Sequence, residues 1–172
     1  AHFLEHLLFK GSKKYSYRKI KESIEGVGGS LNGFTSEELT CYLAKLPYSH
    51  LGLALDVLSD MVINPLLHPE EIEKERTVIA EEIKMYKDLP QGYVHELLDE
   101  LLWPKQPLGM SIIGTNESIN RINREELSIF KKQYYVPSNI VISAAGLLDH
   151  NKLTNRIRNI FSSLKSKDVS PF

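Results

Sequence analysis

Residues 1–9 read Ala1-His2-Phe3-Leu4-Glu5-His6-Leu7-Leu8-Phe9, a run of good helix formers that contains two histidines four positions apart. Residues four apart lie one above the other on a helix, so His2 and His6 can reach the same metal ion. Glu5 falls at the edge of that face, where it suits a general base acting on water at the metal. The order H-x-x-E-H is the reverse of the H-E-x-x-H zinc motif. The alternative is an amphipathic helix whose histidines stack by chance.

A second helix, expected over residues 69–87, supplies candidates for a third ligand. At about 100° per residue, Ile79, Ile83 and Tyr86 fall within about 40° of Ile72, which defines the buried face. Glu75 and Glu82 lie at the edge of this face, whereas Glu81 lies opposite and faces water. Two inward carboxylates need a cation nearby, and a metal with its supporting shell would provide one. Alternatively, both carboxylates reach solvent or pair with Arg76 or Lys74.

Composition restricts the kind of metal site that the chain can build. Its 172 residues contain one cysteine, Cys41, which excludes an internal disulfide framework and a zinc site made of several thiolates. Any metal must therefore be held by histidine and carboxylate. A net charge of −1 argues against a nucleic-acid binder that works through bulk charge. No apolar run approaches the ~18–20 residues that span a bilayer, so neither nucleic acid nor membrane is an expected partner.

The order of periodic segments indicates one helix-rich α+β domain over residues 1–172, which suits the usual size of ~100–200 residues. The first helix lacks a preceding cap, so we expect the chain to be a fragment cut within or just before that helix. Trp103 is expected in the core. The expected helices are 1–10, 15–27, 48–63, 69–87, 91–103, 116–121 (capped by Asn116), 123–135 and 149–162, and the expected strands are 30–35 and 39–46, forming a hairpin, and 139–145, which is buried.

Several of these segments together resemble the inverzincin family of the mitochondrial processing peptidase, pitrilysin and insulin-degrading enzyme, and most closely its processing-peptidase-like branch with bacterial relatives. The resemblance spans essentially the whole chain. It rests on residues 1–11 (AHFLEHLLFKG), 29–37 (GSLNGFTSE), 73–83 (EKERTVIAEEI), 107–114 (PLGMSIIG) and 135–139 (YVPSN).

The resemblance implies a metal site with one Zn²⁺ per chain. His2 and His6 match the family's zinc histidines, and Glu82 matches its distal zinc glutamate. Glu5 matches the catalytic base that activates zinc-bound water, and Glu75 matches the acidic residue that supports the site. The implied activity is that of a zinc-dependent endopeptidase.

The resemblance also implies a substrate-binding strand and a partner. Asn32, Gly33 and Phe34 match the strand beside the zinc, along which extended or presequence-like peptides bind through backbone hydrogen bonds. The implied fold is a two-layer α+β domain with a mainly antiparallel sheet. It is the N-terminal half of a processing-peptidase-like subunit, truncated at its start. The site closes against a homologous C-terminal half or partner subunit, so we expect a dimer, cytoplasmic in a bacterium or alternatively in the mitochondrial matrix.

Two alternatives remain from the sequence. The chain could be a non-catalytic structural or interaction subunit of the same fold, although such subunits typically carry a broken motif and this one is intact. The second alternative concerns a cluster of basic residues. We expect this cluster to be a solvated face, and the alternative is a surface that attracts acidic substrates or a partner. That cluster consists of Lys10, Lys13, Lys14, Arg18, Lys19 and Lys21.

Overall fold

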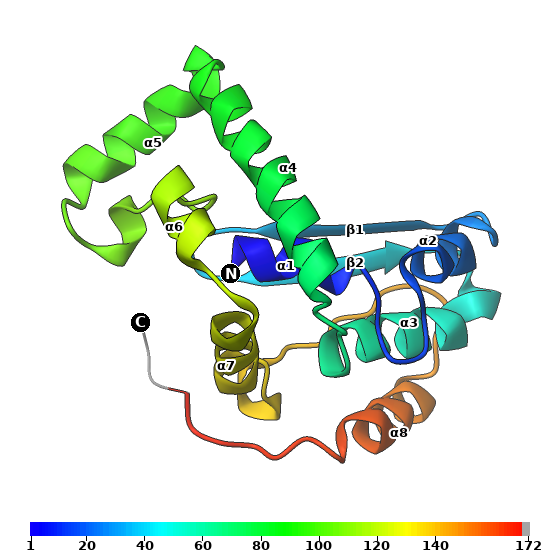
Figure 1. Cartoon of the computed structure of the whole chain (residues 1–172). Helices are drawn as coiled ribbons and strands as arrows, with labels where there is room; N and C mark the ends of the chain where they lie inside the picture. Colours follow the sequence, from blue (N-terminus) through cyan, green and yellow to red (C-terminus); the bar gives the residue numbers. More distant parts are fainter. Residues whose placement is uncertain (170–172) are drawn as a thin grey trace.

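The computed structural model describes residues 1–169 and has an α+β architecture dominated by helices (Figure 1). This confirms the expected fold class. In chain order the elements are α1 (His2–Leu8), α2 (Tyr17–Glu25), β1 (Ser30–Thr35), β2 (Thr40–Lys45), the 3₁₀ helix η1 (Tyr48–His50), α3 (Leu51–Ile63), α4 (Pro69–Lys87), α5 (Pro90–Leu102), η2 (Pro107–Gly109), α6 (Asn116–Arg121), α7 (Arg124–Tyr134), η3 (Pro137–Asn139) and α8 (His150–Phe161).

The two strands form an antiparallel hairpin in which Ser30 pairs with Lys45 and Thr35 with Thr40. Burial alternates along β1, as the two-residue period of a strand requires. Leu31, Gly33 and Thr35 are half-buried, whereas the residues between them are exposed. One face of the hairpin is therefore covered by the helices. Among residues 1–169, β1 pairs with β2 alone, so its other edge has no strand beside it.

The helices pack against this hairpin as a second layer. Helices α1 and α2 contact β1, and α3 contacts β2. Helix α4 packs across α1, and α5 turns back from the far end of α4 (Figure 1). No helix among residues 1–169 combines the length and the apolar character needed to cross a bilayer.

Two apolar cores hold these layers together. The larger core joins α1 to α4: Leu4 and Leu8 are at most 1% exposed and pack with Ile79, which is fully buried. Burying each such side chain contributes about 1.5–3 kcal/mol. The smaller core joins α2 to α3 through Ile20, Ile24, Val57 and Met61. Because apolar contacts fix α1 against α4, the polar edges of these two helices also face each other.

Several sequence-based predictions are wrong. Residues 139–145 form no strand, and Val141 is 94% exposed. Apolar β-branched residues make a strand only when another strand completes their hydrogen bonds, and nothing within residues 1–169 does so. Trp103 is 42% exposed instead of lying in the core, and Tyr86 is 41% exposed instead of lying on the buried face of α4. The cap of α6 is Thr115, whose side chain accepts a hydrogen bond from the Ser118 N–H, and not Asn116.

Candidate metal centre

Helix α1 presents one apolar face and one polar face. Phe3, Leu4, Leu7 and Leu8 are buried in the core, which fixes the rotation of the helix. That rotation places His2 and His6 together on the remaining face, with their ring centroids 4.6 Å apart. The four-residue spacing therefore brings the two imidazoles side by side, as the sequence predicted.

Helix α4 brings a carboxylate to this histidine pair. Glu82 Oε2 lies 3.9 Å from His2 Nε2 and 3.6 Å from His6 Nε2. One ligand atom from each of the three residues lies within 4.8 Å of the others. Glu81 points away from the pair, is exposed and bonds to Lys84, in agreement with the register argument. Neither inward carboxylate pairs with Arg76 or Lys74, which instead bond to Glu73 and Glu71.

The polar atoms of this group suit a metal ion. Glu82 Oε2 and His2 Nδ1 are buried and have no hydrogen-bond partner. An orphaned buried carboxylate oxygen is costly unless a cation or donor occupies its neighbourhood. Two imidazoles and one carboxylate form a catalytic type of zinc ligand set, which leaves a fourth coordination position open. The residues present therefore fit zinc.

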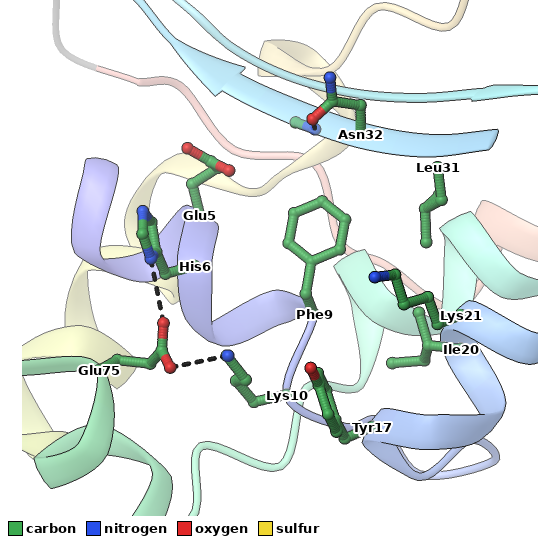
Figure 2. A pocket seen from close by; sticks show the side chains of 11 residues that line it. Glu5, His6, Phe9, Lys10, Tyr17, Ile20, Lys21, Leu31, Asn32 and Glu75 are labelled. Carbon is green, nitrogen blue, oxygen red and sulfur yellow. Dashed lines mark hydrogen bonds and ion pairs between the residues drawn. The ribbon is translucent and has the colours of Figure 1, made fainter. Parts of the chain in front are cut away.

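Glu75 precedes Glu82 by seven residues on α4. It contacts Nδ1 of His6, whereas Glu82 lies near Nε2 of the same ring. The His6 Nδ1–H donates to Glu75 Oε2 at 3.0 Å, and Lys10 Nζ lies 2.7 Å from Glu75 Oε1 (Figure 2). Burial alone would raise the pKa of Glu75, but the contacts with His6 and Lys10 outweigh it and lower the pKa. The ionised Glu75 thus holds the proton of His6 on Nδ1, which leaves Nε2 free to face Glu82.

Lys10 is a member of this arrangement that the sequence analysis missed. We expected it in a solvated basic face, yet its side chain is only 23% exposed and it pairs with the nearly buried Glu75. Its position four residues after His6, in the turn that follows α1, was the available signal. The prediction of a solvated face is therefore wrong for Lys10, whereas Lys14, Arg18, Lys19 and Lys21 are mostly exposed.

The protonation of the histidines follows from their surroundings. Burial, followed by the neighbouring charge of His6, lowers the pKa of His2 to about 4. The hydrogen bond with Glu75 raises the pKa of His6 more than burial lowers it. His2 is accordingly neutral and able to bind a metal at pH 7, while His6 releases a proton more readily at higher pH.

Glu5 is held between α1 and the hairpin, pointing towards β1 (Figure 2). It is 7% exposed, and burial raises its pKa despite the opposing effects of His6 and Thr35. A raised pKa suits a group that takes up and releases a proton near neutral pH. Gly33 allows this close approach, because a Cβ there would lie 2.8 Å from Glu5 Oε1.

The site opens into two cavities on either side of Glu5 and His6. One, of about 450 Å³, contains the three candidate ligands and extends along Asn32–Thr35 of β1. It is also lined by Glu96, a carboxylate that accepts a hydrogen bond from Ser111 and that the sequence analysis did not single out. The other, of about 290 Å³, has an apolar floor that includes Phe9, Ile20 and Leu31 (Figure 2).

The comparison with known proteins identifies the family of the chain. Residues 1–116 match the model of the insulinase family (peptidase family M16). The chain belongs to peptidase family M16. Residues 121–172 match a second model, described as the peptidase M16 inactive domain. The sequence resemblance to this family is therefore confirmed.

Named relatives of the M16 chain are bacterial and mitochondrial. It is 41% identical, over 97% of its own length, to the uncharacterized zinc protease YmxG of Bacillus subtilis, and covers 41% of that protein. It is 37% identical to the probable mitochondrial-processing peptidase subunit beta of Arabidopsis thaliana, over 96% of its length and 31% of the relative. The chain thus spans about two fifths or less of the curated relatives described here.

Solved structures of the family share its fold. A protease from Helicobacter pylori superposes with a TM-score of 0.91 at 27% identity, over 99% of this chain and 42% of that one. Pitrilysin superposes with a TM-score of 0.80 at 25% identity, over 99% of this chain and 19% of that one. The described fold therefore corresponds to a part of each of these two larger chains.

Proposed function

We propose that this chain carries the zinc site of an M16 endopeptidase that hydrolyses extended peptides. The observation that supports this most strongly is the convergence of His2, His6 and Glu82 from two helices, with the buried Glu5 beside them. The names of the relatives, which include zinc proteases and a processing peptidase, point to the same chemistry.

His2, His6 and Glu82 would hold one Zn²⁺, which would polarise the scissile carbonyl and increase the acidity of the attacking water. Glu5 accepts the proton from that water and delivers it to the nitrogen of the leaving amine. Glu75 keeps the His6 proton on Nδ1, and Lys10 keeps Glu75 ionised. Each residue thus has a role that its position on α1, in the turn after α1 or on α4 permits.

The edge of β1 that pairs with no strand among residues 1–169 is the proposed binding surface for the peptide. Asn32, Gly33 and Phe34 line the cavity that contains the candidate ligands. An extended peptide that pairs with this edge would pass Glu5 and Glu82, with affinity from backbone hydrogen bonds and little dependence on side chains. Presequence-like peptides are one class that can adopt this conformation.

A homologous second half or partner subunit would complete the proposed site, by supplying further donors for the oxyanion. We therefore infer that a dimeric or two-half arrangement is needed for turnover. A bacterial cytoplasmic protein, or alternatively a mitochondrial matrix protein, agrees with the bacterial and mitochondrial relatives.

Substituting Glu5→Gln in the full-length protein tests this proposal. The variant should retain zinc and lose hydrolysis of an unstructured peptide by at least ~100-fold, within the 10²–10⁴ range of general acid–base catalysis. Hydrolysis at the original rate would contradict the assignment of Glu5.

A non-catalytic role is the competing function, and the match of residues 121–172 to the M16 inactive domain favours it. It predicts that the full-length protein binds peptides or a partner chain tightly without cleaving them. Measuring peptide binding and cleavage on the same preparation distinguishes the two functions.

A further inference from the structure

Four partly buried hydroxyl groups lie between Glu5 and the far side of the hairpin. The Thr35 Oγ1–H donates to Glu5 Oε2 at 3.3 Å, and Thr35 Oγ1 lies 3.4 Å from Thr40 Oγ1. The OH of Tyr135 lies 2.8 Å from the OH of Tyr42, and an interaction with Thr40 opposes the rise in the Tyr135 pKa that burial causes. We call these four residues, Thr35, Thr40, Tyr42 and Tyr135, the hydroxyl network.

The members of the hydroxyl network come from distant parts of the chain. Thr35 and Thr40 pair across the end of the hairpin, whereas Tyr135 follows α7 and lies 93 positions from Tyr42. Both tyrosines are partly buried and pack against the core that joins α1 to α4. The packing of that core therefore fixes their hydroxyl groups on the side of the hairpin where Glu5 lies.

The charge of Glu5 determines which group donates each hydrogen bond between Glu5, Thr35 and Thr40. An ionised carboxylate only accepts hydrogen bonds, so the proton of Thr35 must point towards Glu5. The remaining lone pairs of Thr35 then accept from Thr40. Hydrogen bonds that are aligned in this way polarise and strengthen one another in a low-dielectric interior.

The opposite side of the Glu5 carboxylate is confined as well. A Cβ at Gly33 would lie 2.8 Å from Oε1 and 2.9 Å from the Phe9 ring, so little room remains there. Thr35 holds Oε2 while the backbone of Gly33 limits Oε1. Strand β1 therefore restricts the rotamer of Glu5 at both oxygens.

We propose that the hydroxyl network positions Glu5 for proton transfer, with Thr35 as the positioning residue that contacts it. The inference rests on the proposed function, in which Glu5 is the general base. Thr35 takes no part in bond breaking. Its hydroxyl keeps the carboxylate aimed at the attacking water, and Thr40 and the tyrosines keep the Thr35 hydroxyl aimed at Glu5.

The test compares four variants in the zinc-loaded full-length protein. Thr35→Val removes the hydroxyl at nearly constant volume, and Thr35→Ser retains it. Tyr135→Phe removes the far end of the network. Thr77→Val is the matched control, because Thr77 is exposed on α4 and its hydroxyl donates to the Glu73 carbonyl of the same helix. For each variant we would measure kcat and KM on an unstructured peptide, zinc content and melting temperature.

The proposal predicts that Thr35→Val lowers kcat about 10- to 100-fold, the loss of one hydrogen bond to a charged group, with KM and zinc content unchanged. Thr35→Ser should recover most of kcat, and Tyr135→Phe should lower it by a smaller factor. Thr77→Val should behave as the parent protein.

Three outcomes would overturn the proposal: an unchanged kcat in Thr35→Val, a Thr35→Ser variant as impaired as Thr35→Val, or a loss of zinc or of folding that accounts for the lower rate. Glu5→Gln separates this failure from that of the proposed function. If Glu5→Gln is inactive while Thr35→Val is fully active, only the positioning role fails. If Glu5→Gln is active, the general-base assignment itself fails.

Discussion

Replacing Glu75 with glutamine removes one charge from behind the candidate metal centre while keeping the side-chain shape. In the structure, Glu75 accepts from His6 through Oε2 and contacts Lys10 through Oε1. Glutamine has one acceptor oxygen and one NH₂ group, so it cannot accept from both. If its oxygen faces Lys10, its NH₂ faces His6 Nδ1 and favours the tautomer with the proton on Nε2, which opposes metal binding.

The magnitude follows from these two contacts. Loss of an outer-shell carboxylate behind a metal histidine typically weakens metal affinity by about 10- to 100-fold. The metal-free protein should lose about 1.5–3 kcal/mol of unfolding free energy, the value of a hydrogen bond to a charged group. The Lys10 side chain is 23% exposed and can turn towards water, so we expect the lower part of that range.

The assay is a zinc titration against a competing chelator, together with urea unfolding of the metal-free protein. Glu81→Gln is the matched control, since Glu81 is an exposed glutamate on the same helix. In the double variant with Lys10→Met, the destabilisation should be smaller than the sum of the single effects, because no buried charge is left unpaired. Unchanged zinc affinity in Glu75→Gln would refute the proposed role of Glu75.

Three further predictions concern pH, the core and a helix cap. The pKa of His2 is about 4 and that of His6 is raised, so only His6 competes with zinc for a proton between these two values. Zinc affinity, measured by chelator competition, should therefore fall about tenfold per pH unit below the His6 pKa, and more steeply only below about pH 4. A fall of about a hundredfold per pH unit at pH 5–6 would contradict this. Ile79→Ala should cost about 2–5 kcal/mol in urea unfolding, whereas Val78→Ala, at a 48% exposed position, should cost far less; equal losses would contradict the assignment of the core. Asn123→Ala should cost about 1 kcal/mol, since the Asn123 side chain caps α7 by accepting from the Glu126 N–H; an unchanged unfolding midpoint would argue against the cap.

Local periodicity was sufficient to predict how the two site helices are oriented. The apolar spacing around Ile79 predicted that Glu82 faces inward and Glu81 outward, and the structure has both. The spacing of His2 and His6 predicted their contact in the same way. These features depend only on the geometry of a single helix and on which face is apolar.

Tertiary contacts were not accessible to that reasoning. The contact between Tyr42 and Tyr135 joins residues 93 positions apart, and no local pattern relates them. The environment of Lys10 was predicted wrongly because a lysine in a basic segment is expected to be solvated unless an acidic partner is known. Its partner, Glu75, lies on α4, far away in the sequence. The apolar residues 139–145 were misjudged for the opposite reason, since a strand requires a neighbour that its own sequence does not specify.

The central claim, that His2, His6 and Glu82 bind one zinc ion, is tested most directly by elemental analysis of dialysed protein. We would compare the parent protein with Glu82→Gln and with its exposed neighbour, Glu81→Gln. The account predicts about one zinc per chain in the parent and in Glu81→Gln, and its loss in Glu82→Gln. A parent protein without zinc, or a Glu82→Gln variant that retains it, would contradict the claim.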